Sequence, residues 1–199
     1  MLLSSCQDPG SPPVPGAVTE TTTAPPAASA SPSGSSSPSS GNPGVYKPAD
    51  SKGKAENVPV PVMPELAKEN SKEGLEAFIR YWFQLLSYAY ETGDTARVAG
   101  LSSQQCALCG HLGRAVSKSY EDGSWMTGGI LQTPVVEVRW DSSSYSQQAQ
   151  VQLIQTEIRY FAADGTEHRE LTGATNDAVA FFAEFRNDAW TTLDTGIIR

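Results

Sequence analysis

The first regular pattern of apolar residues in the chain has the period of a helix. Asn70 and Glu73 have the spacing of a capping box at its start, and Gly93 can end a helix in the left-handed conformation. This segment is predicted to form one long amphipathic helix over residues 70–91. Apolar side chains recur along it at three- and four-residue steps, at Leu75, Phe78, Ile79, Trp82, Phe83, Leu86 and Tyr90.

Two shorter helices are predicted after the first. Asp94 can cap a short second helix that runs through Ala99, so that the first two helices form a helical hairpin. A third helix is predicted over about 103–120, although two internal glycines disfavour it. Its repeating positions are Cys106, Cys109, Gly113, Val116 and Tyr120.

After Gly128–Gly129 the pattern changes to the alternation of a strand. Val136, Val138 and Trp140 alternate with polar residues, which predicts a half-buried strand over 136–141. A second strand is predicted over about 148–162. Its apolar phase shifts between Leu153 and Ile154, which predicts a β-bulge at that point.

The last third of the chain predicts further antiparallel strands. Residues 163–166 form a tight hairpin signal, and a strand over 166–173 follows. Residues 178–185 are apolar on both faces, so this strand is predicted to be central and covered on each side. After a turn at 186–189, a final strand carries Trp190, Leu193, Ile197 and Ile198. Helices followed by an antiparallel sheet predict an α+β fold for a domain at 58–199.

Residues 7–57 have a different composition from the rest of the chain. Ser, Pro, Gly, Ala and Thr dominate them, and no aromatic residue precedes Tyr46. Such a segment buries too little apolar area to offset the entropy of ordering it. We expect a disordered tether with a span of roughly 40 Å, closed by a stiff, proline-rich lead-in at 58–64.

Length and charge exclude several classes of function. The 199 residues fit one domain plus the tether, and the formal net charge is -8 with a pI near 4.7. Because no Lys and Arg cluster exists to track phosphates, nucleic acid is not an expected partner. No stretch of 18 apolar residues is present to span a bilayer. An acidic surface is also repelled by anionic lipid, so membrane association would require a covalent anchor.

The first six residues suggest such an anchor. Leu3-Ser4-Ser5-Cys6 resembles the bacterial lipobox, in which an apolar and two small residues precede the cysteine that is lipidated. Residues 1–6 are then the remnant of a lipoprotein signal peptide, and Cys6 becomes the first residue of the mature protein. We expect the coding sequence to continue upstream with a basic and then an apolar segment of roughly 15 to 25 residues.

Several positions in the domain resemble a family of actinobacterial lipoproteins that share a domain of unknown function. The positions are Pro64-Glu65, Gly74, Phe78, Tyr81-Trp82, Gly93-Asp94 and the pair Cys106 and Cys109. The order of elements is also similar to the nuclear transport factor 2-like, or SnoaL-like, cone fold. That resemblance implies helices packed on a curved antiparallel sheet. It does not select a function, because the superfamily includes isomerases, cyclases, dehydratases and pure binding modules.

Cys106 and Cys109 form a C-x-x-C motif with four interpretations. In an exported protein a local disulfide is the default, since residues three apart on a helical turn have α-carbons within disulfide range. A thiol-disulfide redox pair, a zinc site that adds His111 and His168, and reduced structural thiols remain as alternatives.

Other candidate residues carry weaker signals. Trp125 lies among loop residues and either lines a pocket mouth or anchors packing, and Trp140 is a second candidate for pocket lining. No nucleophile, phosphate loop or metal cluster stands out, so we name no catalytic residue and expect no metal or cofactor.

Three functions remain open at this stage. The first is a lipid-anchored, non-catalytic binding or assembly module at the outer face of the cell membrane, with a homodimer partner or an envelope protein partner. The alternatives are a small SnoaL-like enzyme that transfers protons in a cone-shaped pocket, and a thiol-disulfide redox protein.

Overall fold

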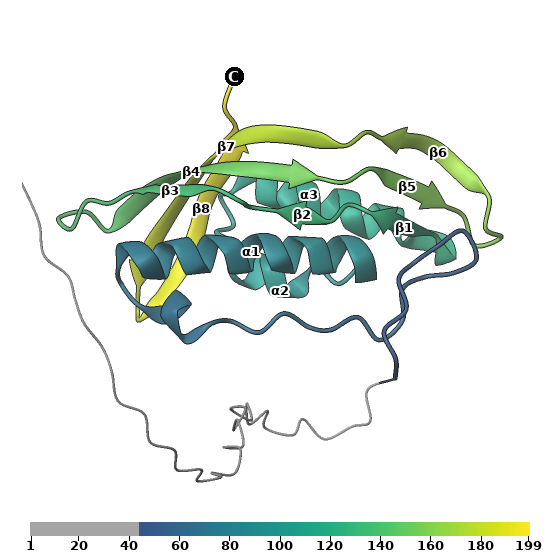
Figure 1. The fold of residues 1–199 in the computed structure, drawn as a ribbon, viewed down its shortest axis with the longest axis horizontal. Coiled ribbons are helices and arrows are strands. Elements are labelled where there is room, and N and C mark those ends of the chain that lie inside the picture. Colours follow the sequence, from purple (N-terminus) through teal and green to yellow (C-terminus); the bar gives the residue numbers. More distant parts are fainter. Residues whose placement is uncertain (1–43) are drawn as a thin grey trace, which may run out of the picture. The chain divides into compact units, whose positions relative to one another are not determined.

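The computed structural model describes residues 44–199; Cys6 and the predicted tether up to residue 43 lie outside the described residues. The described part has the α+β fold that was predicted, with helices first and antiparallel strands afterwards (Figure 1). Its helical elements are η1 (Glu65–Lys68), α1 (Lys72–Thr92), α2 (Ala96–Gly100), α3 (Ala107–Ser119) and η2 (Glu121–Gly123). Its strands are β1 (Trp125–Gly128), β2 (Leu131–Gln132), β3 (Val136–Arg139), β4 (Ser146–Gln155), β5 (Ile158–Phe161), β6 (Glu167–Thr172), β7 (Thr175–Arg186) and β8 (Ala189–Ile197).

Helix α1 is close to the predicted long helix but is capped by a different residue. The N-cap is Ser71 rather than Asn70, because the Ser71 hydroxyl accepts the Gly74 N–H at 3.0 Å. At the other end, Gly93 has φ of 80° and donates its N–H to the Ala89 carbonyl, as predicted. None of the helices within residues 44–199 is long and apolar enough to cross a membrane.

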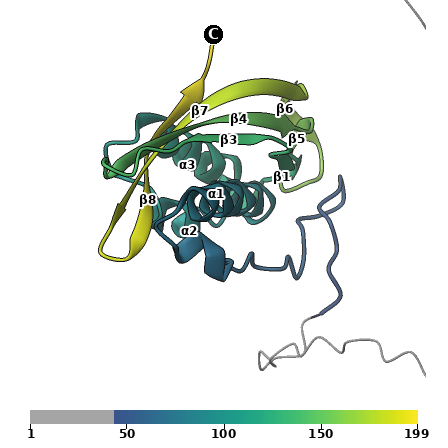
Figure 2. The same cartoon turned by 60° about the vertical axis from the view of Figure 1, so that its left-hand side comes forward.

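The strands form two antiparallel sheets. In the larger sheet, β4 pairs with β2 and β3 on one side and with β7 on the other, and β8 pairs with β7. The smaller sheet has the order β1-β5-β6. The helices lie together on one side of the larger sheet (Figures 1 and 2). Strand β7 lies between β4 and β8 and is therefore central, as predicted.

The long predicted strand over 148–162 is divided in two. The pairing of β4 with β7 is unbroken from Ser146 to Gln155, so the predicted bulge at Leu153 is wrong. The chain leaves this ladder just afterwards, at Thr156. There the Ile130 N–H donates to the Thr156 hydroxyl, and the Thr156 N–H donates to the Ile130 carbonyl. The chain therefore leaves β4 and continues to β5 without an extra residue inserted in β4.

The core lies between α1 and the larger sheet. Phe181 of β7 packs against Trp82 and Phe83 of α1, with ring centroids 5.5 and 5.9 Å apart. Full burial of such side chains contributes about 1.5–3 kcal/mol each. On the opposite face of β7, Phe182 is 37% exposed. The prediction that β7 is covered on both faces is thus wrong, because the helices cover only one face of the described sheet.

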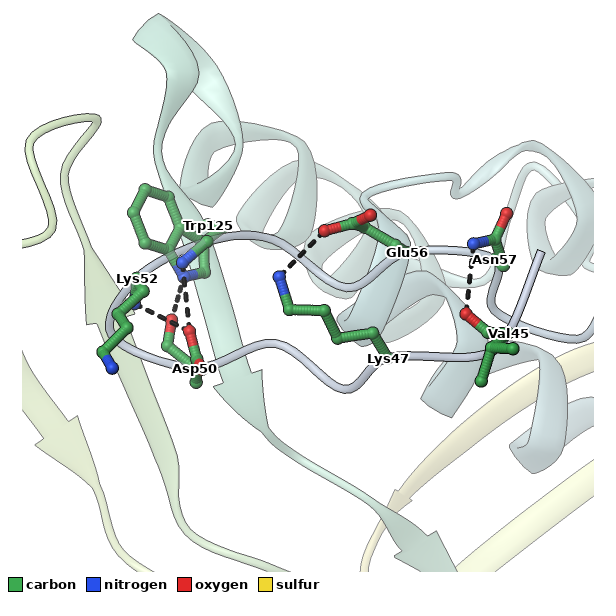
Figure 3. A network of polar contacts seen from close by, with 8 residues as sticks. Val45, Lys47, Asp50, Lys52, Glu56, Asn57 and Trp125 are labelled. Atoms are coloured by element: carbon green, nitrogen blue, oxygen red, sulfur yellow. Dashed lines mark hydrogen bonds and ion pairs between the residues drawn. The ribbon is translucent and has the colours of Figure 1, made fainter.

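Residues 44–57 form an N-terminal hairpin that belongs to the domain, so the predicted domain boundary at residue 58 is too late. The hairpin is closed by the Lys47–Glu56 ion pair and by a turn in which the Asp50 carboxylate accepts two backbone N–H groups (Figure 3). Trp125 of β1 donates its indole N–H to the Asp50 carbonyl at 2.8 Å. Long-range contacts therefore order a segment whose composition alone predicts disorder.

Candidate binding site

The cysteine pair forms the start of α3. Cys106 and Cys109 are disulfide-bonded, with α-carbons 5.3 Å apart, so the default interpretation is confirmed. Cys106 is the N-cap of the helix, and its sulfur accepts the Cys109 N–H at 3.2 Å. The loop that leads into it is fixed to β8, because the Ser103 N–H donates to the Thr192 carbonyl at 2.7 Å.

The disulfide and its surroundings also bear on the zinc and redox interpretations of the cysteine pair. Both sulfurs are used in the disulfide, and no cluster of three or more potential metal ligands occurs among residues 44–199. The position of Cys106 at a helix N-terminus is one feature of redox-active pairs. However, Cys106 is only 2% exposed, which shields the sulfur that would be attacked first in a C-x-x-C of that kind.

An interhelical cavity of about 640 Å³ lies beside the disulfide. Its floor consists of Trp82 and Leu86 from α1 and Val98 from α2. Cys109, Leu112 and Gly113 of α3 form the facing wall. The volume is within the range of about 300–1,000 Å³ that is typical of ligand pockets. This cavity is the principal candidate site in the described part of the chain.

The polar groups on the floor of the interhelical cavity are already hydrogen-bonded within the protein. The Trp82 indole N–H donates to the Ser102 hydroxyl at 2.9 Å, and that hydroxyl donates to the Val98 carbonyl at 2.7 Å. The floor consequently offers apolar surface and no free donor to an occupant.

The rim of the cavity is polar and carries two cations. Arg114 and Lys118 lie one turn apart on the exposed edge of α3, and Glu121 follows at the end of that edge. Within residues 44–199, neither cation forms an ion pair. This pair was not among the residues predicted from the sequence. The available signal was two basic residues at helical spacing next to two helix-interior glycines.

A second, helix–sheet cavity lies between α1, α3 and the larger sheet. Its volume is about 220 Å³, and apolar side chains such as Phe83, Leu112 and Val179 line most of it. Asp177 and Tyr90 are its ionisable residues. Burial raises the pKa of Tyr90 to about 12, so its hydroxyl stays protonated at neutral pH.

The two tryptophans predicted as pocket lining contribute to neither cavity. Trp125 is 4% exposed and stacks on Phe161, with ring centroids 5.7 Å apart, so it anchors packing and holds the N-terminal hairpin. Trp140 is half-buried and meets the edge of Trp190 at 6.3 Å. In both residues the indole ring meets another aromatic ring rather than either cavity.

Similarity to known proteins is found at the level of the fold. No curated protein matches the chain. The chain is similar to the intermembrane space region of the chloroplast protein ARC6, at 8% identity and a TM-score of 0.47 over 65% of this chain and 98% of that chain. It is also similar to a protein with a cystatin-like fold from Caulobacter vibrioides, at 18% identity and a TM-score of 0.42 over 64% of this chain and 91% of that chain. A third similar structure is Aln2 from a Streptomyces species, at 9% identity and a TM-score of 0.43 over 66% of this chain and 94% of that chain. Likenesses at this level assign no function.

One family model matches most of the sequence, over residues 44–196. The match begins at the N-terminal hairpin and ends within the last residues of β8. The chain therefore belongs to the family of unknown function DUF6318.

Proposed function

We propose that the chain is a lipid-anchored extracytoplasmic protein whose α+β domain is a non-catalytic binding module, with the interhelical cavity as its binding site. The observation that carries the binding role is this cavity of about 640 Å³, which has an apolar floor without free polar groups. The compartment is supported by the Cys106–Cys109 disulfide, since such bonds persist where the surroundings are oxidising. The lipobox-like residues ending in Cys6 supply the anchor.

Binding without catalysis fits the chemistry of the cavity. Its floor residues, Trp82, Leu86 and Val98, carry no acid, base or nucleophile. The disulfide in its wall holds both sulfurs in a bond. An occupant would meet apolar surface below and charge at the rim, which is the composition typical of small-molecule sites.

The enzyme alternative rests on the helix–sheet cavity, because it contains Asp177 and Tyr90. A half-buried carboxylate and a neutral phenol in one pocket are the elements of an acid–base pair. The volume of about 220 Å³ is below the usual range for ligand sites. If this alternative holds, Asp177→Asn will abolish turnover of a substrate and leave dye binding at the interhelical cavity unchanged.

The anchor can be tested by metabolic labelling with palmitate. The native gene, with its upstream region, is expressed alongside a Cys6→Ser variant, and both proteins are recovered from membrane and soluble fractions. Label and membrane association are expected for the natural chain and not for the variant. Equal labelling of both, or no labelling of either, would refute the lipid anchor.

Binding can be tested separately with the full chain carrying Cys6→Ser and an intact disulfide. A neutral naphthylamine dye, whose emission rises in apolar surroundings, should bind at one site. Gly113→Leu should abolish the binding, since no atom lies within 4 Å of a Cβ at this position and a leucine can extend into the cavity. The matched control is Ala115→Leu, on an exposed part of α3 that does not line the cavity. Equal binding by both variants would reject the interhelical site.

A further inference from the structure

The interhelical cavity contains two features that the fold itself does not require. The first is the pair of glycines Gly110 and Gly113, which line the cavity from inside α3. Each disfavours the helix relative to alanine. Neither has a positive φ. A Cβ at Gly113 would meet nothing within 4 Å, and one at Gly110 would meet only the tip of Arg114, at 3.2 Å.

No neighbour within residues 44–199 therefore explains these glycines. Their effect is to leave the α3 backbone bare along the cavity wall, next to Cys109 and Leu112. Glycine is used where another group approaches a backbone closely. The group that fits this wall is an apolar one, because the polar groups of the floor already have partners within the protein.

The second feature is the charge of the rim. The chain has a formal net charge of -8, yet Arg114 and Lys118 present two cations on one edge of the opening, without an acidic partner among the described residues. Side chains one helical turn apart can converge on a single anionic group. Glu121, at the far end of the same edge, disfavours an anion there and so places it between the two cations.

From these observations we infer that the interhelical cavity binds a free long-chain fatty acid. The alkyl chain lies over Trp82, Leu86 and Val98 and along the bare backbone at Gly113, and the carboxylate pairs with Arg114 and Lys118. This inference rests on the proposed binding function and names the ligand class of the same site. The two cations pair with one carboxylate, and the apolar floor contacts one alkyl chain.

The inference is tested by competition with the bound naphthylamine dye on the full chain carrying Cys6→Ser. Saturated fatty acids of increasing length are used below their aggregation limits. Affinity should rise about fourfold per added methylene until the cavity is filled, because each buried CH₂ contributes a constant increment. The methyl ester, which has the same chain without charge, should compete less well than the acid.

Charge variants then examine the rim. The double variant R114Q/K118Q should weaken fatty acid binding about tenfold more than it weakens dye binding, since paired charges at an exposed rim contribute modestly. The matched control is Arg139→Gln on β3, which does not line the cavity and should change neither affinity. Raised salt should weaken binding of the acid and not of its ester.

The outcomes separate the two proposals. If the dye binds at Gly113 but the acids compete no better than their esters or alkylamines, the fatty acid inference fails and the binding module stands. Stronger competition by lysophospholipids or alkyl phosphates than by the acids would also overturn it, in favour of a phosphate ligand. If the dye does not bind the interhelical cavity, both proposals fail.

Discussion

The disulfide provides a prediction whose size follows from the structure. It closes a loop of only three sequence positions, from Cys106 to Cys109. By the chain-entropy relation, loss of such a short loop constraint destabilises the fold by about 2 kcal/mol. Cys106 also accepts the Cys109 N–H as the helix N-cap. Loss of that acceptor should add about 1 kcal/mol.

Two double variants divide these contributions. C106A/C109A loses the bond and the cap, whereas C106S/C109A loses the bond but keeps an oxygen acceptor at the N-cap. For a domain of this size, about 1 kcal/mol lowers Tm by about 2–4 °C. We expect decreases of about 6–12 °C for the alanine variant and about 4–8 °C for the serine variant.

The assay is thermal unfolding followed by circular dichroism, with and without a reductant. Reductant should lower Tm for the natural chain and leave both variants unchanged. The reasoning would be refuted if reductant had no effect on the natural chain while mass measurement showed its sulfurs reduced. Equal Tm values for the two variants would show instead that the sulfur acceptor does not stabilise the helix start.

Three further changes test other parts of the fold. Trp125→Phe keeps an aromatic ring but removes the hydrogen bond to the N-terminal hairpin, so stability should fall by about 1 kcal/mol and proteolysis within the hairpin should increase. The control is Trp140→Phe, because the Trp140 indole N–H has no partner in the described part of the chain. This control variant should leave proteolysis of the hairpin unchanged. Ser71→Ala should destabilise by about 1 kcal/mol through loss of the N-cap, and Asn70→Ala by much less, as chemical denaturation would reveal. Burial raises the pKa of Tyr90 from 10.0 to about 12, so Tyr90 ionises first in the unfolded chain, and stability should decline as the pH rises between these two values. In alkaline denaturation, Tyr90→Phe should reduce that decline. An identical decline in the variant would contradict the raised pKa of Tyr90.

The elements of the domain were largely predictable because each has a strong local pattern. The apolar spacing of α1 matches its buried face, and Gly93 ends it as its left-handed conformation requires. Strand β7 was placed centrally from its apolar character alone. Its outer face was misjudged, since the exposure of Phe182 depends on which elements lie nearby and not on the strand's own sequence.

The parts that were missed depend on contacts between distant residues. The N-terminal hairpin is polar and is ordered by Trp125, which lies 75 positions beyond Asp50. Strand β2 has only two residues and pairs with the end of β4, so it has no period of its own. The interhelical cavity combines residues of three helices, and no local pattern reports the space between them.

Helix α3 is where local sequence and observed structure disagree most. Its interior glycines argue against a helix, yet Ala107–Ser119 is helical. Natural proteins depart from local rules mainly at functional sites. If Gly113 is retained for the cavity and not for folding, Gly113→Ala should stabilise the protein by about 1 kcal/mol.

Gly74 is the appropriate contrast, because it is a helix glycine with a packing reason. A Cβ there would lie 2.2 Å from the Glu69 carbonyl oxygen, so Gly74→Ala should destabilise. Denaturant unfolding of the two variants should therefore shift the midpoint in opposite directions. A lower midpoint for Gly113→Ala would mean that the α3 backbone packs more closely than the open space at this position indicates, and it would remove the argument that these glycines serve a ligand.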